Sequence, residues 1–262
     1  MRTALAQFIL LLTLLPVSGA LARGYGGGYE DQMLISNGQG VSSPGFWEGL
    51  KSSNPAGLSY NQRMKFQGCV ATFDSAASTI SESAGVLGSV GPVGGGVEYS
   101  RFGAGPYGKG AVNWGLATGL DSASLRLGLS GHHLSGANGS YDFGFLFDPS
   151  RAIRFGFLLP AVQNGLRLAG AGFTFGLDST FDLVIDGAMD LKSRDSIVKP
   201  GLTLHADRFV VTGAYGFRTK GTSDPILYSK VSAAIGMRIT DHILVEYTYR
   251  GLPEHLVGLT LR

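Results

Sequence analysis

Two histidines and a serine are the residues of this sequence whose types and spacing most readily suggest chemistry. His132, His133 and Ser135 stand close together, and His133-Leu134-Ser135 has a His-x-Ser spacing. A serine nucleophile needs a histidine base within hydrogen-bond reach and a third group that orients the base, a role open to Asn138 or Asp142. The same residues also fit a strand end followed by a polar loop rich in serine and glycine. We favour the loop and predict no catalytic residue.

The other candidate chemical groups indicate structural roles. His205, His242 and His255 are expected at strand ends on different hairpins, and their spacing is not that of a metal-ligand set. Cys69 is the single cysteine, so it cannot form an internal disulfide, and we expect a structural residue in a strand. We therefore predict neither a metal site nor a cofactor.

The stretch 141–158, YDFGFLFDPSRAIRFGFL, indicates which elements position these groups. Large aromatic residues share one parity, and glycine, charged residues and leucine share the other, on both sides of a turn predicted at Asp148-Pro149-Ser150. A period of two is the period of a β-strand. In an outer-membrane barrel the apolar face meets lipid while the small or polar face lines the lumen. We interpret the stretch as a membrane hairpin.

Further strands follow with little interruption, at lengths that suit tilted membrane strands. Pro200 falls inside one of them, where we expect a bulge or a strand end. The candidates are Met64–Phe73, Val93–Phe102, Ala111–Thr118, Ser124–His132, Ser140–Phe147, Ile153–Leu159, Leu166–Gly176, Phe181–Asp190, Ile197–His205, Phe209–Phe217, Tyr228–Ile239, Ile243–Tyr249 and His255–Leu261, with Thr79–Leu87 as an additional one.

Short turns that contain an aspartate recur about one hairpin apart, and mostly longer connections lie between them. The aspartates are Asp121, Asp148, Asp178, Asp207 and Asp241; the longer connections are His133–Gly139, Pro160–Gly165, Lys192–Asp195 and Arg218–Leu227. Barrels of this type have short periplasmic turns and longer external loops, and periplasmic termini require an even number of strands. We predict an all-β fold, a transmembrane antiparallel β-barrel of about 14 strands, with 12 as the alternative.

Side-chain parity assigns residues to the two faces of this barrel. The charges predicted to face the lumen carry both signs and could pair across it, or line an ion path: Lys65, Glu98, Arg126, Asp142, Arg154, Arg167, Asp182, Asp186, Arg238 and Glu246. Glycines such as Gly94-Gly95-Gly96 would leave lumen space or permit bends. Candidates for interfacial aromatic girdles are Tyr99, Trp114, Tyr141, Tyr215, Tyr247 and Tyr249.

The start of the chain predicts export. Met1-Arg2, the apolar run Ala4–Val17 and an Ala-x-Ala site ending at Ala22 are the three parts of a signal peptide. We therefore divide the chain into a signal peptide (1–22), an N-terminal periplasmic or lumenal segment (23–62) and an outer-membrane barrel (63–262). A formal net charge of +2 gives no basic field for nucleic acid, and 44% hydrophobic residues argue against disorder.

Asn54-Pro55-Ala56-Gly57-Leu58 is the motif that suggests a family. Pro55 fixes φ and Gly57 permits a tight bend, so the residues alone indicate a turn that leads into a strand. The motif, preceded by a short apolar segment and followed by a strand, resembles the N-terminal box of the FadL family, outer-membrane transport proteins for long-chain fatty acids and other hydrophobic compounds. The resemblance implies a 14-stranded barrel whose N-terminal segment folds into the lumen as a plug.

From the pattern and the resemblance we expect an outer-membrane β-barrel of a Gram-negative bacterium that passes hydrophobic, fatty-acid-like small molecules by a passive route. Its expected partners are outer-membrane lipid, a hydrophobic ligand and the barrel assembly machinery, and not nucleic acid. The alternatives are a structural or assembly-related barrel without transport, an outer-membrane lipid hydrolase, and an exported soluble β-protein, because alternation alone cannot distinguish lipid from a partner sheet.

Overall fold

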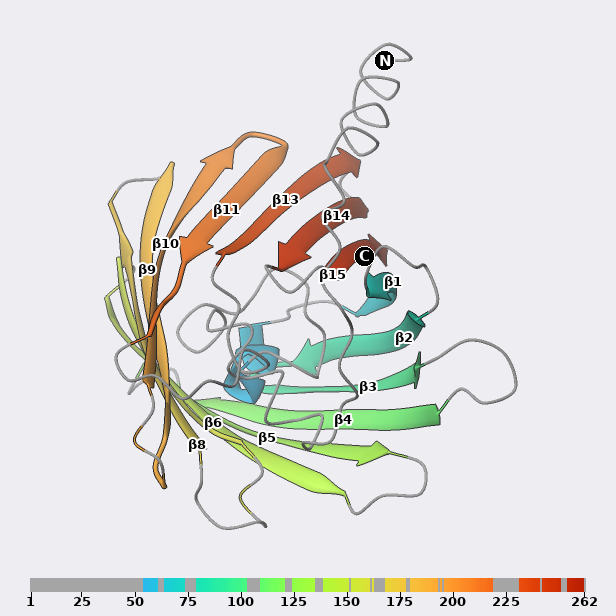
Figure 1. Ribbon diagram of the computed structural model, residues 1–262, viewed down its shortest axis with the longest axis horizontal. Coiled ribbons are helices and arrows are strands. Elements are labelled where there is room, and N and C mark those ends of the chain that lie inside the picture. Colours follow the sequence, from blue (N-terminus) through green and yellow to red (C-terminus); the bar gives the residue numbers. More distant parts are fainter. Residues whose placement is uncertain are drawn as a thin grey trace.

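The structure, a computed structural model, describes residues 54–60, 64–73, 79–102, 109–120, 124–134, 139–150, 152–160, 162, 168–177, 180–192, 194, 196–218, 231–240, 242–250 and 254–261. Over these residues the chain forms one antiparallel β-sheet that curls round until its two ends meet and encloses a lumen (Figure 1). A short 3-10 helix, η1 (Pro55–Tyr60), lies inside the ring. No helix within these ranges is long and apolar enough to span a membrane.

The strands follow one another round the ring in chain order. Fifteen strand segments are described, and because the two-residue β12 pairs with β10 as β11 does, they form a wall of 14 strands. This confirms the predicted 14-strand barrel, and the additional candidate at Thr79–Leu87 lies within β2. The segments are β1 (Lys65–Phe73), β2 (Thr79–Val90), β3 (Val93–Phe102), β4 (Lys109–Leu120), β5 (Leu125–Leu134), β6 (Ser140–Ser150), β7 (Ile153–Leu159), β8 (Leu168–Gly176), β9 (Phe181–Asp190), β10 (Ser196–Ala206), β11 (Phe209–Tyr215), β12 (Phe217–Arg218), β13 (Val231–Thr240), β14 (Ile243–Arg250) and β15 (Glu254–Leu261).

Backbone hydrogen bonding closes the ring. β1 pairs with β15 from Phe66↔Leu261 to Phe73↔Glu254, so the first strand of the wall meets the last. Because a lipid bilayer offers no partner for backbone N–H and C=O groups, a closed sheet is one of the two backbone arrangements that can cross it. The closed ring therefore meets the main physical requirement of a membrane barrel.

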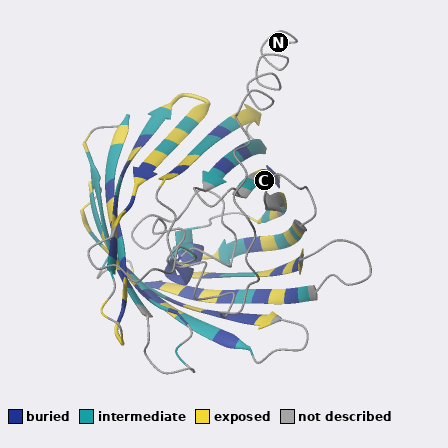
Figure 2. Ribbon diagram, viewed as in Figure 1, coloured by how far each residue is buried: buried dark blue, intermediate teal, exposed yellow. Residues whose placement is uncertain are grey.

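Side chains alternate between the two faces of the wall. On β3, Val97 and Tyr99 are more than half exposed, whereas Glu98 and Ser100 are buried. Figure 2 shows the resulting bands of buried and exposed residues along the strands. The apolar face is outward and the small or polar face inward, as a barrel in lipid requires.

Asp148-Pro149-Ser150 does not form a turn, so that prediction was wrong. Strand β6 continues to Ser150, and its register with β7 shifts between Phe147 and Ser150. The Asp148 carboxylate reaches the Arg154 guanidinium of the next strand at 2.6 Å. By contrast, Asp207 forms the predicted tight turn between β10 and β11, with φ of 43°.

Pro200 lies inside β10 and interrupts the ladder on one side only. β10 keeps its register with β9 through Pro200↔Ile185. On its other side the pairing passes from Gly201↔Ala214 on β11 to Val198↔Phe217 on β12. Proline has no N–H to donate to a ladder. We predicted a bulge or a strand end at Pro200. The structure shows instead that Pro200 lies in an unbroken strand, opposite the gap between β11 and β12.

Aromatic side chains gather on the outward face near the ends of the strands that lead into the longer connections. The Trp114 and Tyr141 rings meet edge to face with centroids 6.2 Å apart, and Trp114 covers Gly131, where a Cβ atom would lie 2.4 Å from the indole. On β14 and β15 the Tyr247 hydroxyl and His255 Nδ1 are 2.7 Å apart. This arrangement fits an interfacial girdle at that end of the barrel.

Several predictions concern residues outside the described ranges. These are the signal peptide and most of the N-terminal segment, three of the five aspartate turns (Asp121, Asp178 and Asp241), and most of the longer connections.

An arginine on the outward face should lower the free energy of unfolding strongly at the centre of a strand and only slightly at its end. Ile185, at the centre of β9, and Phe181, at its first residue, are both exposed on this face. We expect Ile185→Arg to lower the free energy of unfolding by roughly 2–4 kcal/mol and Phe181→Arg by about 0–1 kcal/mol. Unfolding by urea in lipid vesicles, followed by tryptophan fluorescence, measures both values. Equal costs would contradict a lipid-facing surface.

Candidate functional site

The predicted motif Asn54-Pro55-Ala56-Gly57-Leu58, here called the NPAGL box, lies in the lumen and runs into η1. The Asn54 side-chain oxygen accepts the Ala56 N–H at 3.1 Å, and the Asn54 carbonyl accepts the Gly57 N–H at 2.9 Å. Pro55 supplies the φ that a first helical residue needs and has no N–H to leave unpaired. These local bonds explain why the box forms a compact turn.

Asn54 also fixes the box to the wall. Its side-chain nitrogen donates to the carbonyl of Phe145 at 3.0 Å and to the carbonyl of Phe157 at 3.1 Å. These two residues are register partners on β6 and β7. Asn54 is 1% exposed, so its amide needs these acceptors. An aspartate here would place a carboxylate against two carbonyl oxygens, which explains why the position requires an amide.

Three inward-facing glycines allow the box to lie directly on the wall; we call Gly94, Gly128 and Gly144 the glycine seat. A Cβ atom on Gly94 would lie 2.2 Å from the Leu58 carbonyl oxygen, and one on Gly128 would lie 2.2 Å from the Ala56 nitrogen. On Gly144 it would lie 2.0 Å from the Asn54 side-chain oxygen. Real Cβ atoms do not come this close to other atoms. The box and the seat on β3, β5 and β6 therefore fit each other only while these residues remain glycine.

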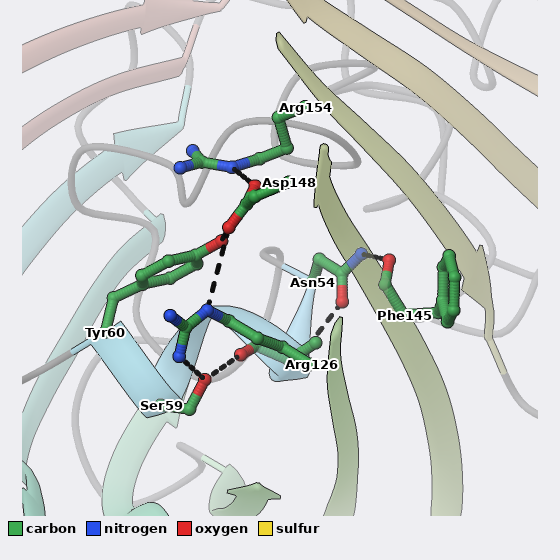
Figure 3. Close-up of polar contacts among 8 residues, drawn as sticks. Asn54, Ser59, Tyr60, Arg126, Phe145, Asp148 and Arg154 are labelled. Atoms are coloured by element: carbon green, nitrogen blue, oxygen red, sulfur yellow. Dashed lines mark hydrogen bonds and ion pairs between the residues drawn. The ribbon is translucent and has the colours of Figure 1, made fainter. Parts of the chain in front are cut away.

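The last residue of η1 joins an ion-pair cluster on the wall, formed by Tyr60, Arg126, Asp148 and Arg154 (Figure 3). The Tyr60 hydroxyl donates to Asp148, whose carboxylate also accepts from Arg154 Nε at 2.6 Å and lies 3.7 Å from Arg126 Nε. The two guanidinium groups lie 4.0 Å and 4.7 Å from the centroid of the Tyr60 ring. The ring thus lies against two cations while its hydroxyl binds the anion between them.

The electrostatics of this Tyr60 cluster keep the phenol neutral. Burial, and next the hydrogen bond to Asp148, raise the pKa of Tyr60 to about 12. At neutral pH the hydroxyl therefore remains a donor to the carboxylate. Arg126 also donates to the Ser59 hydroxyl at 3.3 Å, and Ser59 in turn donates to the Ala56 carbonyl. The NPAGL box, η1 and strands β5 to β7 are consequently joined by one polar network.

A second polar network lies on the inward face of β3 to β6, nearer the ends that lead into the longer connections; we call it the His132 cluster. It contains Glu98, Ser100, Asn113, His132 and Asp142. Ser100 donates to Glu98 at 2.9 Å, and Asn113 lies within 3.4 Å of Glu98 and 3.3 Å of Ser100. Asn113 Oδ1 is 3.0 Å from His132 Nδ1, and Asp142 Oδ2 is 2.9 Å from His132 Nε2.

The geometry of His132 bears on the hydrolase alternative. Asp142 binds one ring nitrogen, as an orienting residue would, but Asn113 binds the other nitrogen. A histidine base needs that second nitrogen for the serine. Ser135 and Asn138 lie outside the described residues.

The other predicted chemical residues are spread around the wall. His205 binds Asp182 at 2.7 Å, His242 follows the end of β13, and Cys69 lies in β1. No group of three or more histidine, cysteine, aspartate or glutamate side chains in the described part of the chain is arranged to hold a metal ion.

The position of the inward charges was predicted, but their pairing was not. Glu98, Asp186 and Glu246 are buried on the lumen face as parity predicts. The ion pairs of Arg126, Arg154, His132 and His205 that the structure describes join neighbouring strands, however, and not opposite sides of the lumen. Neighbouring strands lie about 5 Å apart, so they are the nearest source of a partner.

Sequence reasoning missed two residues of the site and one buried charge elsewhere on the lumen face. Asp148 was expected in a turn and Tyr60 in the segment that leads into β1. Lys199, which is fully buried opposite Asp186, was not expected on the lumen face. The inward position of Lys199 could have been predicted from the sequence. Lys199 has the opposite parity to Val198 in the predicted strand Ile197–His205, and Val198 is exposed on the outward face.

Alanine at the glycine seat should displace the NPAGL box while leaving the wall intact. We expect Gly128→Ala and Gly144→Ala to lower the free energy of unfolding by about 1–3 kcal/mol and to raise ion conductance in planar bilayers, because a forced Cβ atom must move the box off the wall. Gly213→Ala on β11 is the matched control, since a Cβ there meets nothing within 4 Å. The proposed fit is refuted if all three variants behave alike.

Removing the anion at the centre of the Tyr60 cluster should also loosen η1. We expect Asp148→Asn to lower the free energy of unfolding by roughly 1–3 kcal/mol, because the two guanidinium groups then lose their shared carboxylate. Asp182→Asn, which weakens a single more exposed contact to His205, should cost about 0–1 kcal/mol. Chemical unfolding of both variants in the same detergent measures the difference, and a larger loss in Asp182→Asn would argue against the cluster as an anchor.

Comparison with known proteins supports the fold. No protein-family model matches the chain, and no curated protein matches it in sequence. Among solved structures it is similar to the "CymD monoaromatic hydrocarbon channel", with a TM-score of 0.57 and 9% identity over 86% of this chain and 95% of that chain. It is also similar to a deltaS2S3 mutant of the TodX monoaromatic hydrocarbon channel, with a TM-score of 0.52 and 9% identity over 79% of this chain and 91% of that chain.

A third structure, titled "Bacterial polysaccharide outer membrane secretin", has a TM-score of 0.50 and 8% identity over 77% of this chain and 99% of that chain. At such identities the likeness concerns the fold. The resemblance to the FadL family, predicted from the NPAGL box, is accordingly confirmed as structural similarity to hydrocarbon channels of that family. The chain has the fold of an outer-membrane β-barrel channel, with a short N-terminal helix packed inside it.

Proposed function

We propose that this chain is an outer-membrane barrel that passes hydrophobic small molecules, with the NPAGL box and η1 as its lumenal plug. The observation that carries the proposal is the fit of the box onto the glycine seat. A barrel that served only as a scaffold would have no need of inward glycines on three strands that match one short segment. The similarity to two structures titled monoaromatic hydrocarbon channels agrees with this choice.

The inward surface beside the box suits an apolar molecule. Leu146 and Leu158 on β6 and β7 are buried and inward, and Leu58 packs with Leu87 and Ala117 in a buried apolar cluster. A ligand would enter from the longer connections, contact these residues, and leave through the wall or past the N-terminal segment. Such a route needs no energy source, because transfer from water to an apolar surface is favourable.

The proposal includes the location of the chain and its division. Residues 1–22 act as a signal peptide, 23–62 form the N-terminal segment and 63–262 the barrel, inserted in the outer membrane of a Gram-negative bacterium by the barrel assembly machinery. The described part of the segment supports this division, since η1 ends at Tyr60 and β1 begins at Lys65. The protein would have no catalytic activity of its own.

Uptake by whole cells separates transport from the alternatives. A strain that lacks the gene should take up radiolabelled toluene and decane slowly; wild-type protein should restore uptake, and Gly144→Ala should change it, whereas Gly213→Ala should behave as wild type. A scaffold barrel would instead leave uptake unchanged and cause an envelope defect on deletion. A lipid hydrolase would release fatty acid from vesicles and lose that activity in Ser135→Ala. Unchanged uptake on deletion would refute the proposal.

A further inference from the structure

Three rings on the outward face of β3 to β5 each lie over a glycine of the next strand. The pairs are Tyr99 over Gly110, Trp114 over Gly131 and His133 over Gly139, and a Cβ atom on the glycine would lie between 2.4 and 2.7 Å from the nearest atom of the side chain above it. At Gly131 the nearest indole atom is Cε2, followed by its two neighbours Nε1 at 2.5 Å and Cζ2 at 2.6 Å, so the backbone meets the face of the ring and not its edge. The indole of Trp114 therefore lies flat against the wall and turns its other face outward.

These rings belong to a continuous surface, here called the aromatic patch and defined as Tyr99, Trp114, His133 and Tyr141. The Tyr141 ring meets Trp114 edge to face at 6.2 Å and His133 edge to face at 5.9 Å between centroids. Tyr99 is the register partner of Val112, which lies two residues before Trp114 on the same face of β4. Tyr99 is 53% exposed, so the patch is open to whatever surrounds the barrel.

A cation borders the aromatic patch. Arg101 follows Tyr99 on the outward face of β3, and both Arg101 and His133 are exposed. Among the outward residues that the structure describes on β3 to β6, none is acidic. An outward carboxylate, Glu82, lies beside Arg101 on β2, but on its β4 side Arg101 faces Gly110, which has no side chain. An anionic group on the patch would thus meet a guanidinium at one edge and an imidazole two strands, or about 10 Å, away.

We propose that the aromatic patch and Arg101 form a docking surface for the phosphorylated sugar headgroup of an outer-leaflet glycolipid such as lipid A. This inference rests on the outer-membrane location in the proposed function and adds a lipid partner to it. Aromatic rings near the ends of membrane strands lie at the level of the lipid headgroups. The face of an aromatic ring carries partial negative charge and attracts the C–H groups of a sugar ring, and a guanidinium binds phosphate through two parallel hydrogen bonds. A phospholipid headgroup without sugar would use only Arg101.

Binding of three lipids to the purified full-length protein in detergent tests the docking surface. The probes are lipid A, phosphatidylglycerol, which has phosphate without sugar, and a glucosyl diacylglycerol, which has sugar without phosphate. We expect wild type to bind lipid A most tightly. Trp114→Leu should weaken lipid A binding roughly tenfold and phosphatidylglycerol binding less than about twofold; Arg101→Gln should weaken both roughly tenfold and leave the glucosyl lipid within about twofold. Tyr215→Leu is the matched control, since Tyr215 is an outward aromatic residue, 41% exposed, at the last residue of β11.

Equal affinity of wild type for lipid A and phosphatidylglycerol would overturn the docking surface, because an ordinary aromatic girdle treats the two lipids alike. So would lipid A binding that is unchanged in either patch variant, or that Tyr215→Leu weakens as much as Trp114→Leu does. Transport is judged by a separate measurement. Unchanged uptake on deletion of the gene refutes the proposed function whether or not lipid A binds, and absent lipid A binding with deletion-sensitive uptake refutes the docking surface alone. Heat-dependent gel migration of each variant confirms that it is folded.

Discussion

The contact between the NPAGL box and the glycine seat is the constraint on which the lumen depends. Backbone atoms of the box lie 2.2 Å from where the β-carbons of Gly94 and Gly128 would be, so any larger residue at these positions would push the segment away. Because η1 ends at Tyr60, the contact of the Tyr60 ring with Arg126 and Arg154 on the wall also depends on this close approach. A few missing methyl groups thus determine where the polar network of the lumen forms.

Around this seat the wall combines two kinds of chemistry. The outward face is apolar because it must match lipid, and the inward face contains hydroxyls, carboxylates, guanidinium groups and glycines in alternation with it. The inward groups gather into separate layers along the strands, with the Tyr60 cluster on one side of the box and the His132 cluster on the other. Charged groups in such a lumen are stabilised mainly by partners one strand away, where hydrogen-bond distances are possible.

Much of the fold could be predicted from the sequence, because the period of two extends through nearly every strand. Val93–Phe102, Ile153–Leu159 and Phe181–Asp190 were placed with the observed boundaries, since a turn residue or a change of parity marks each end. The failures have physical causes. Asp148 resembled a turn residue because Asp-Pro-Ser is typical of turns, but β6 continues through it, and Asp148 keeps the inward parity of Gly144 and Leu146, which brings it close to two arginines. The motif was recognised, whereas its contacts were not, because the seat consists of single glycines on three separate strands, which only the pairing of β3 to β6 brings together.

The pairing of β1 with β15 has a consequence for the order of assembly. The ring cannot close until the final strand has been made, and until then both edge strands expose unpaired backbone groups that invite association with other chains. The box immediately precedes β1, and its seat is provided by β3, β5 and β6, all in the first half of the wall. The segment can therefore dock while the sheet is still open, and the closing of β15 onto β1 then encloses it, so that the barrel is built around its occupant.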